Sequence, residues 1–338
     1  MLRVALLSQW HVHARGYAEE FRKSGKARVA AVWDEIPERG RAWADELGAD
    51  FVGGLDALLD RADIDAVAVN TPTVMHEEVM VKAARAGKHI FTEKAMAPTV
   101  AECERIAAAV EKAGVTFVIS MPQRASSVMQ FAKQAVESGE FGTISHARFR
   151  NGHSGVSGNW LPDYWYDLGA AAGGALMDLG CHPAYCACYL FGRPVEVGGM
   201  LASPCGSQSK AGGPVGNYMF DESACAVVRF GNGVTATAET SFVTYGMPDL
   251  IEIYGSDATF YRVGDDVKYK SRKTAEFASG FIAPNLPKAL DPPITQFIDA
   301  CLNGTGSPAG FGPEDGINLT KVLEGAYISQ REKRVVSV

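Results

Sequence analysis

Short apolar runs alternate with amphipathic stretches along the first third of the chain. The apolar runs lie at residues 3–7, 27–33, 66–70, 89–92 and 116–120. The stretches with the spacing of an amphipathic helix lie between them, at residues 14–24, 39–47, 76–86 and 100–113. Strands that are apolar throughout and separated by helices indicate parallel βαβ units with both sheet faces covered. The pattern predicts a doubly wound α/β fold of the nucleotide-binding type.

The pattern changes after about Gln123, where strands begin to predominate. After a helix predicted at residues 126–138, strands are expected at residues 144–150, 196–202, 223–230, 234–242, 250–254 and 259–263. Turn sequences at 231–233 and 255–257 join neighbouring strands as hairpins. A surface loop is expected at 204–216, and late helices at 294–303 and 313–331. We therefore predict a nucleotide-binding domain over residues 1–122, followed over residues 123–338 by an α+β domain with a mostly antiparallel sheet.

Composition and charge narrow the classes of function. The 338 residues suffice for two domains, and 32 Lys and Arg against 39 Asp and Glu give a net charge of −7. Without a Lys- or Arg-rich run, the chain lacks the electrostatic footprint of a nucleic-acid binder. Its apolar runs fall short of the ~18 residues that suggest a membrane span, and the apolar start is too short for a signal peptide. The sequence predicts a soluble, cytoplasmic protein with no nucleic-acid or membrane partner.

Seven cysteines cannot all pair within one chain, and without a secretion signal we expect reduced thiols. Cys181, Cys186 and Cys188 cluster, but their spacing is not that of a structural zinc site. We expect buried thiols and no metal.

The turn after the first predicted strand contains no glycine. Its sequence is Ser8-Gln9-Trp10-His11-Val12-His13. A dinucleotide fold usually carries G-x-G-x-x-G here, so that backbone N–H groups can approach a pyrophosphate. The helix N-terminus that follows can still bind phosphate, although Trp10 and His11 would crowd the approach. An ordinary loop without a ligand is the alternative.

Asp34 directly follows the second predicted strand. A carboxylate at this position accepts hydrogen bonds from both ribose hydroxyls of NAD and repels the 2′-phosphate of NADP. Followed by Glu35, it favours NAD. The alternative is a solvated charge at the start of a loop.

Two further strands are followed by polar residues. Asn70, Thr71 and Pro72, with His76 beyond them, follow one strand, and Glu93 and Lys94 follow the next. The carboxyl ends of parallel strands are where such folds bind ligands. A lysine there can touch a substrate hydroxyl and, if desolvated, take part in proton transfer. The alternative is a surface ion pair of Glu93 and Lys94.

Residues 173–182 read Gly-Gly-Ala-Leu-Met-Asp-Leu-Gly-Cys-His. If they begin a helix, Asp178 and His182 are four apart and share one face, beneath an approach that the two glycines open. An imidazole titrates near neutrality, as a general acid or base must. The alternative is a helix N-terminal Asp and a core His.

Lys94 in a Glu-Lys pair, followed later by G-G-x-L-x-D-x-G-x-H, resembles the Gfo/Idh/MocA family of sugar and cyclitol oxidoreductases. Thr71-Pro72 with His76 is similar to the family's turn after its fourth strand, and residues 314–329 resemble its last helix. The resemblance covers nearly the whole chain. It implies an N-terminal Rossmann domain and a C-terminal α+β domain whose open sheet forms a subunit interface, hence a homodimer or homotetramer. It also implies oxidation of a secondary alcohol of a sugar, glycoside or cyclitol by NAD(P), or the reverse reduction.

By the same resemblance, Lys94 hydrogen-bonds the reacting hydroxyl, His182 accepts its proton, and Asp178 binds a neighbouring hydroxyl or orients the imidazole. NAD is the expected cofactor, with NADP less favoured. The residues expected around the cofactor follow the predicted strands and are Ser8, Trp10, His11, Val12, Asp34, Asn70, Thr71, Pro72, His76, Glu93 and Lys94.

Three positions depart from the family pattern. The glycines of the first turn are missing, Ala95 stands where the family has a proline, and Tyr185 stands where it often has an acidic residue. The last change removes any extra acid or base partner at that position.

An aromatic-rich segment precedes the two glycines. It contains Asn151, His153, Trp160, Tyr164, Trp165 and Tyr166. Because sugar C–H faces stack on aromatic rings, we hypothesise that this segment is a substrate lid. The expected substrate-binding residues are Arg124, His153, Trp160, Trp165 and Tyr166. A packing cluster at the domain interface is the alternative.

Two other functions stay open. The first is a redox-neutral glycosidase or lyase that uses the same oxidation transiently. The second is a non-catalytic ligand-binding or regulatory protein, which the loss of the turn glycines favours and the retention of Lys94, Asp178 and His182 opposes.

Overall fold

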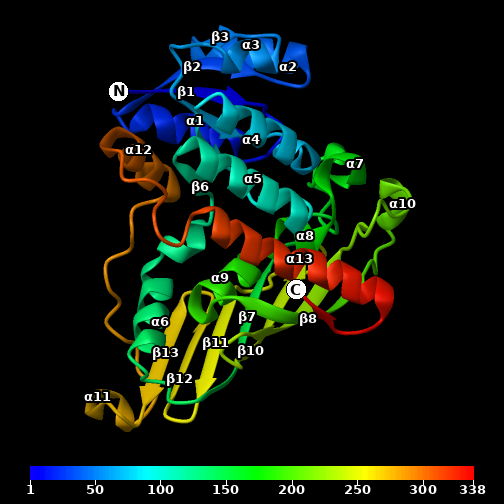
Figure 1. Ribbon diagram of the computed structural model, residues 1–338. Helices are drawn as coiled ribbons and strands as arrows, with labels where there is room; N and C mark the ends of the chain where they lie inside the picture. Colours follow the sequence, from blue (N-terminus) through cyan, green and yellow to red (C-terminus); the bar gives the residue numbers. More distant parts are fainter. The chain divides into compact units, whose positions relative to one another are not determined.

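The five apolar runs of the first third form strands of one parallel sheet, and a sixth, short strand at residues 50–51 joins them (Figure 1). The computed structural model describes residues 1–338 and divides into one unit of Met1–Met121 with Asp291–Ile317, and a second of Pro122–Leu290 with Asn318–Val338. The strand order in the first unit is β3-β2-β1-β4-β5-β6. These strands are β1 (Leu2–Leu7), β2 (Ala27–Trp33), β3 (Asp50–Phe51), β4 (Ala66–Val69), β5 (His89–Thr92) and β6 (Phe117–Ile119). The order reverses between β1 and β4, and open α/β sheets bind ligands at the carboxyl ends of the strands beside such a switch point.

Helices pack on this sheet and confirm the βαβ pattern. They are α1 (Ala14–Lys23), α2 (Pro37–Leu47), α3 (Leu55–Leu59), the short η1 (Thr73–Met75), α4 (His76–Arg85), α5 (Val100–Ala113) and α12 (Pro293–Asn303). The predicted boundary between residues 122 and 123 put α12 in the second domain, whereas the structure groups it with the first unit. The reason is apolar packing, because the Phe297 ring of α12 lies 5.8 Å from Phe91 of β5 and 6.4 Å from Phe21 of α1. The functional division of the chain stays a prediction.

The second unit contains an eight-stranded sheet in the order β13-β12-β11-β7-β10-β9-β8-β14. Its strands are β7 (Ile144–Gly152), β8 (Pro194–Ala202), β9 (Ser223–Phe230), β10 (Thr235–Ser241), β11 (Leu250–Gly255), β12 (Ala258–Val263), β13 (Asp266–Ser271) and β14 (Val336–Ser337). Only β7 and β10 pair in parallel. Both predicted hairpins are present, and Gly233 takes the positive φ of +87° that its turn needs. The sheet is mostly antiparallel, as expected.

One face of this sheet is covered by helices and the other is open. The helices are α6 (Ser127–Glu137), α9 (Cys181–Phe191) and α13 (Pro313–Glu332), whose first residues belong to the first unit. α13 approaches β8 closely, because a Cβ on Gly199 would lie 2.5 Å from the Ala326 carbonyl oxygen. On the opposite face, which we call the open face, Met200 and Val227 are 79% and 45% exposed. Arg148 pairs there with Glu239 and Glu252.

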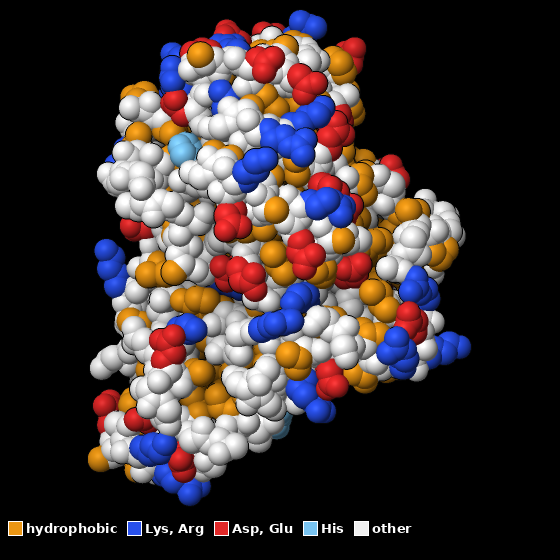
Figure 2. Space-filling model, in the orientation of Figure 1, with side chains coloured by type: hydrophobic (Ala, Val, Ile, Leu, Met, Phe, Trp, Pro, Cys, Tyr) orange, Lys and Arg blue, Asp and Glu red, His pale blue; other side chains and the backbone are white.

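Short helices fill the remaining connections. They are η2 (Pro122–Ala125), η3 (Asp163–Tyr166), α7 (Leu168–Ala171), α8 (Ala175–Asp178), α10 (Gln208–Ala211) and α11 (Ala275–Ala278). α10 lies within the predicted surface loop. All seven cysteines are free thiols. None of the helices combines the length and apolar character that crossing a membrane requires. On the face shown in Figure 2, basic and acidic side chains are interspersed rather than gathered by sign.

Candidate active site

The carboxyl end of β4 carries buried polar atoms that no protein group pairs. Asn70 Oδ1 and Thr71 Oγ1 are both buried and have no hydrogen-bond partner. His76 is buried beside them, with Nε2 3.1 Å from the Thr71 carbonyl oxygen and Nδ1 3.0 Å from that of Ala95. Burial lowers the pKa of His76. An unpaired buried polar atom costs about 1–3 kcal/mol, so the two oxygens call for a ligand with complementary groups.

Glu93, just after β5, is a buried anion held by several donors. Its Oε2 accepts the Lys94 backbone N–H at 2.9 Å. Its Oε1 accepts from the Tyr17 hydroxyl and lies 2.7 Å from His13 Nδ1. Burial alone raises a carboxyl pKa, but nearby positive charges, first on His11 and then on Lys94, outweigh it. The pKa of Glu93 therefore lies well below its usual range.

Glu93 and Lys94 are 1% and 5% exposed, which excludes the alternative of a surface ion pair. The peptide bond from Lys94 to Ala95 is cis. Ligand atoms of His11, His13 and Glu93 lie within 4.8 Å of one another, close enough to hold a metal ion. Both Glu93 oxygens already have hydrogen-bond partners within the protein. The carboxylate therefore needs no metal ion to compensate its burial, and we assign the cluster no metal.

The glycine-free first turn is stabilised by its own side chains. Ser8 adopts a φ of +71°, a conformation that glycine adopts without strain, and its Oγ accepts the Trp10 backbone N–H at 3.0 Å. Trp10 and His11 are buried. Val12 and the half-exposed His13 are therefore the side chains that lie open beside the N-terminus of α1, rather than the pair expected to crowd it.

Asp34 is buried at the end of β2, which excludes the alternative of a solvated loop charge. Its carboxylate accepts the backbone N–H groups of Gln9 and Ile36 at 2.9 and 2.8 Å. The Arg39 guanidinium donates to both of its oxygens, at 2.9 Å from Nε and 2.7 Å from Nη2. Arg39 is not among the residues predicted from the sequence, because a helical arginine gives no sign of which carboxylate it will meet.

These residues fit a dinucleotide. Unpartnered buried oxygens occur on Glu35 after β2 and on Asn70 and Thr71 after β4, on either side of the β1 turn. Hydroxyl, amide and carboxyl oxygens suit the ribose hydroxyls and the carboxamide of NAD.

In the second unit, residues 173–182 do not begin one continuous helix, which was the condition for Asp178 and His182 to share a helix face. Asp178 ends α8 and His182 is the second residue of α9, with Leu179 and Gly180 between the two helices. The His182 backbone N–H donates a hydrogen bond to the Leu179 carbonyl oxygen at 3.0 Å. A Cβ on Gly180 would lie 2.6 Å from the Leu176 carbonyl oxygen, so the chain turns tightly here. Asp178 and His182 both remain partly exposed.

The two glycines of this motif are packing positions and do not open an approach. A Cβ on Gly174 would lie 2.1 Å from the Asp221 carbonyl oxygen, and one on Gly173 would lie 2.5 Å from the Tyr327 hydroxyl. The buried Asp221 carboxylate accepts from the Tyr327 hydroxyl at 2.6 Å and from the Leu176 backbone N–H at 2.8 Å. Burial raises the pKa of Asp221 to about 6. Asp221 is not among the residues predicted from the sequence, because nothing in its neighbouring residues indicates that it will hydrogen-bond to the turn at Leu176.

Tyr185, at the position where the family often has an acidic residue, is a hydrogen-bond partner of His182. Its hydroxyl lies 2.8 Å from His182 Nδ1 and accepts the Gln123 backbone N–H at 3.2 Å. Burial raises the pKa of Tyr185 well above its usual range, so this partner is uncharged. Arg124 is fully buried and donates from Nε and Nη2 to the Tyr185 carbonyl at 3.1 and 2.9 Å. Its contact with a substrate stays a prediction.

The aromatic segment is largely packed. The His153 ring stacks on Phe242 at a centroid distance of 5.1 Å and lies 4.6 Å from the Trp160 ring. Trp165 and Tyr166 are buried, whereas Trp160 is 56% exposed. The structure thus shows a packing cluster that leaves Trp160 open, and the role of these residues in substrate binding stays a prediction.

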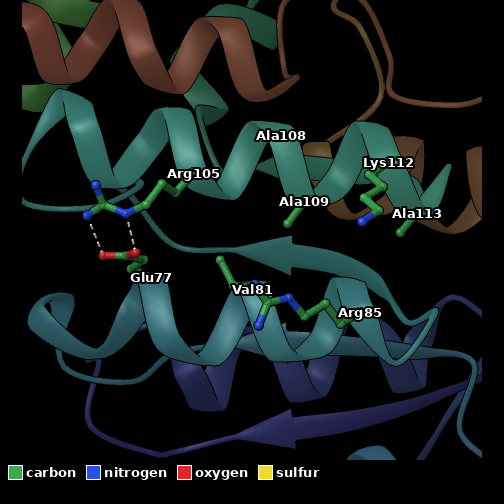
Figure 3. A pocket seen from close by; sticks show the side chains of 8 residues that line it. All are labelled: Glu77, Val81, Arg85, Arg105, Ala108, Ala109, Lys112 and Ala113. Carbon is green, nitrogen blue, oxygen red and sulfur yellow. Dashed lines mark hydrogen bonds and ion pairs between the residues drawn. The ribbon is translucent and has the colours of Figure 1, made fainter.

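A surface groove of about 570 Å³ lies elsewhere, between α4 and α5 (Figure 3). Its floor is apolar and its rim charged, and its lining residues are Glu77, Val81, Arg85, Arg105, Ala108, Ala109, Lys112 and Ala113. Glu77 and Arg105 pair across it. No predicted site residue lines this groove.

Two family models match separate parts of the chain. Residues 11–121 match a model described as an oxidoreductase family with an NAD-binding Rossmann fold, and residues 129–261 match the GFO/IDH/MocA C-terminal domain. Inositol 2-dehydrogenase of Rhizobium meliloti is 27% identical over 97% of this chain and 95% of its own. Levoglucosan dehydrogenase of Pseudarthrobacter phenanthrenivorans is 28% identical over 60% of this chain, which spans 56% of that relative. A 2,7-anhydro-N-acetylneuraminate hydratase of Escherichia coli is 30% identical over 63% of this chain and 55% of its own.

Solved structures agree in fold. An oxidoreductase domain protein from Kribbella flavida is 24% identical, with a TM-score of 0.85 over 100% of this chain and 99% of its own. Levoglucosan dehydrogenase in complex with NADH and levoglucosan is 21% identical, with a TM-score of 0.84 over the same shares. The two family models together span most of both units, and the chain belongs to the Gfo/Idh/MocA family of oxidoreductases, with an NAD-binding Rossmann fold.

Proposed function

We propose that this protein transfers a hydride between NAD and a secondary alcohol of a sugar, glycoside or cyclitol. NAD, when bound, takes the hydride from the carbinol carbon or returns it to a carbonyl. The proposal rests on what lies at the carboxyl ends of β4 and β5, which are neighbouring strands. Unpartnered oxygens of Asn70 and Thr71 follow β4, and the ionised Glu93 and the buried Lys94 follow β5. Relatives named as inositol and levoglucosan dehydrogenases support the class of alcohol.

Lys94 stabilises the negative charge that develops on the reacting oxygen. An ammonium group in a site shielded from water interacts with a growing alkoxide more strongly than it would in bulk water. The buried Glu93 carboxylate offsets that positive charge when no substrate is present. The reacting hydroxyl is therefore expected to meet Lys94 Nζ.

His182 exchanges the proton of the alcohol, and Asp178 binds a neighbouring hydroxyl. The Tyr185 hydroxyl lies 2.8 Å from His182 Nδ1 and orients the imidazole. General acid–base assistance of this kind contributes about 10²–10⁴ in rate.

The test is a panel of myo-inositol, levoglucosan, D-glucose and simple glycosides with NAD and NADP in turn, following the absorbance of the reduced nicotinamide. Replacing Lys94 by Met is expected to lower turnover at least about 10²-fold while leaving NADH binding in place. Lys112→Met, on the rim of the α4–α5 groove, is the matched control and should keep full turnover. Full activity of Lys94→Met would overturn the role of Lys94, and a panel without any turnover would favour a non-catalytic protein.

A redox-neutral reaction is the second candidate, because the relative from Escherichia coli is named a hydratase. In this scheme hydride removal at one carbon acidifies the adjacent C–H, a leaving group is eliminated, and the hydride is returned. Turnover of a glycoside without net accumulation of NADH would favour it, and stoichiometric NADH would exclude it.

We also propose that the open face of the second sheet is a subunit interface in a homodimer or homotetramer. Met200 and Val227 expose apolar surface beside the paired Arg148, a mixture suited to association. Met200→Asp together with Val227→Asp should reduce the mass measured by light scattering to that of a monomer. An unchanged mass would place the interface elsewhere.

A further inference from the structure

The two oxygens of the Glu93 carboxylate bind different parts of the first unit. Oε2 accepts the Lys94 backbone N–H at 2.9 Å. Oε1 accepts from the Tyr17 hydroxyl and lies 2.7 Å from His13 Nδ1. Because an ionised carboxylate can only accept, His13 Nδ1 carries the proton of this contact. His13 therefore donates a charge-assisted hydrogen bond to a buried anion.

His13 stands where the dinucleotide fingerprint has its last glycine. When the glycine-free turn over residues 8–13 is set against G-x-G-x-x-G, the histidine falls at the sixth position. A glycine there has no side chain with which to reach the carboxylate that follows β5. The departure from the fingerprint therefore gives Glu93 a hydrogen-bond donor that a glycine-rich turn cannot supply.

His13 is also the solvent-facing member of the cluster around Glu93. Its side chain is 49% exposed, whereas those of Glu93 and His11 are 1% and 5% exposed. Tyr17 is buried, and its hydroxyl lies 2.7 Å from Ser120 Oγ. Since the Tyr17 proton is donated to Glu93, Ser120 is the donor of that second contact. His13 is thus the donor that can be replaced without opening a cavity in the core.

We propose that His13 is a positioning residue for Lys94, because it fixes the carboxylate that holds the Lys94 backbone and balances its ammonium charge. With Oε1 bound by His13, Oε2 stays directed at the Lys94 N–H. Without His13, Oε1 loses one of its donors, the carboxylate rotates more freely, and Lys94 is aimed less precisely at the alcohol. The inference rests on the proposed function in that Lys94 meets the reacting hydroxyl.

The test combines steady-state kinetics at saturating NAD, using an alcohol that is turned over, with calorimetric binding of NADH. His13→Leu removes the donor and should lower kcat at least about tenfold, because a displacement of about 1 Å at a reacting group costs up to ~10²-fold. KM for the alcohol should stay nearly unchanged, and the NADH dissociation constant should change less than kcat. His13→Asn places an amide nitrogen where Nδ1 lies and should restore most of kcat.

The route through Glu93 is tested by a double-mutant cycle. In the Glu93→Gln background, His13→Leu should have little further effect on kcat, because the charge that His13 holds is already absent. Urea unfolding of the same four proteins gives a readout that needs no substrate. There His13→Leu should raise the unfolding equilibrium constant about threefold to tenfold in the wild type, and little in Glu93→Gln.

His89→Leu is the matched control. This histidine begins β5, and its Nδ1 accepts the Thr116 backbone N–H at 2.9 Å instead of meeting an ionised group, so kcat should not change. A wild-type kcat in His13→Leu overturns the inference while the role of Lys94 stands. Equal losses of kcat in the wild-type and Glu93→Gln backgrounds, or a loss confined to NADH binding, also overturn it. A wild type that turns over no alcohol overturns the proposed function and this inference together.

Discussion

The two segments that supply the predicted catalytic side chains hold them by different physics. After β5, Lys94 is next to the ionised, buried Glu93, which several donors surround. In the second unit, His182 is hydrogen-bonded to the hydroxyl of the uncharged Tyr185. In the turn before it, the Leu176 backbone N–H donates to the Asp221 carboxylate.

The two arrangements differ in how much folding free energy is lost when one partner is removed. Removing one member of a buried ionic group leaves an uncompensated charge and costs about 3–5 kcal/mol. Losing a neutral hydrogen bond costs a net 0.5–1.5 kcal/mol, roughly. The Lys94 segment therefore ties its chemistry to the stability of the fold, whereas the contact between Tyr185 and His182 can change with little effect on folding.

The largest expected effect is at Glu93. Glu93→Gln removes the negative charge while keeping the shape, and should lower the free energy of unfolding by about 3–5 kcal/mol. Urea denaturation measures this. Glu77→Gln, which breaks an exposed pair with Arg105, is the control and should cost at most about 1 kcal/mol. Equal losses in the two variants would show that the Glu93 cluster contributes no more than a surface pair.

Gly174→Ala tests the steric part of the second segment. The added Cβ would meet the Asp221 backbone at 2.1 Å, so we expect a loss of about 3 kcal/mol in unfolding free energy. Gly213→Ala, with no atom within 4 Å of the new Cβ, should change it little. If Gly174→Ala is as stable as Gly213→Ala, the close packing against Asp221 does not constrain this turn.

The two segments should respond to pH in opposite directions. The pKa of Asp221 rises from 3.8 to about 6, so folding favours its protonated form. Its stabilising contribution is full below about pH 4 and is lost as pH rises through 6, a change of about 3 kcal/mol. The pKa of Glu93 is lowered, so its contribution is present above about pH 4.5 and is lost as pH falls towards the folded-state pKa.

Unfolding free energies measured between pH 4 and 7 check the Asp221 part of this prediction. Asp221→Asn cannot titrate, and its stability should fall less steeply over this range than that of the wild type. Parallel curves for the two proteins would contradict it.

The smallest expected effect is at Tyr185. Tyr185→Phe keeps the ring and removes the hydroxyl at His182 Nδ1, and should lower kcat about tenfold, as expected for about 1.4 kcal/mol of lost alignment, with KM nearly unchanged. Tyr189→Phe, on the same helix and hydrogen-bonded to Gln130 instead, is the control. A change confined to KM would show that Tyr185 acts on substrate binding rather than on His182.

Local pattern was enough for the elements of the parallel sheet. The predicted bounds 27–33, 89–92 and 100–113 are those of β2, β5 and α5, because strands buried on both faces and capped helices leave a strong local signal. The short β3 and β14 lack such a signal. The continuous helix that would place Asp178 and His182 on one face is interrupted at Leu179 and Gly180, because close packing at Gly180 overrides helical spacing.

The sequence by itself determined the fold class, the family resemblance and the strand ends where Asn70, Thr71, Glu93 and Lys94 stand. Only the tertiary structure decided which groups meet those residues, as in the contacts of Arg39 with Asp34 and of Tyr185 with His182. The physical reason is that periodicity records which face of an element is buried. The partner of a polar side chain depends instead on close approaches between elements, and at Gly40 and Gly174 these turn on the absence of a single Cβ.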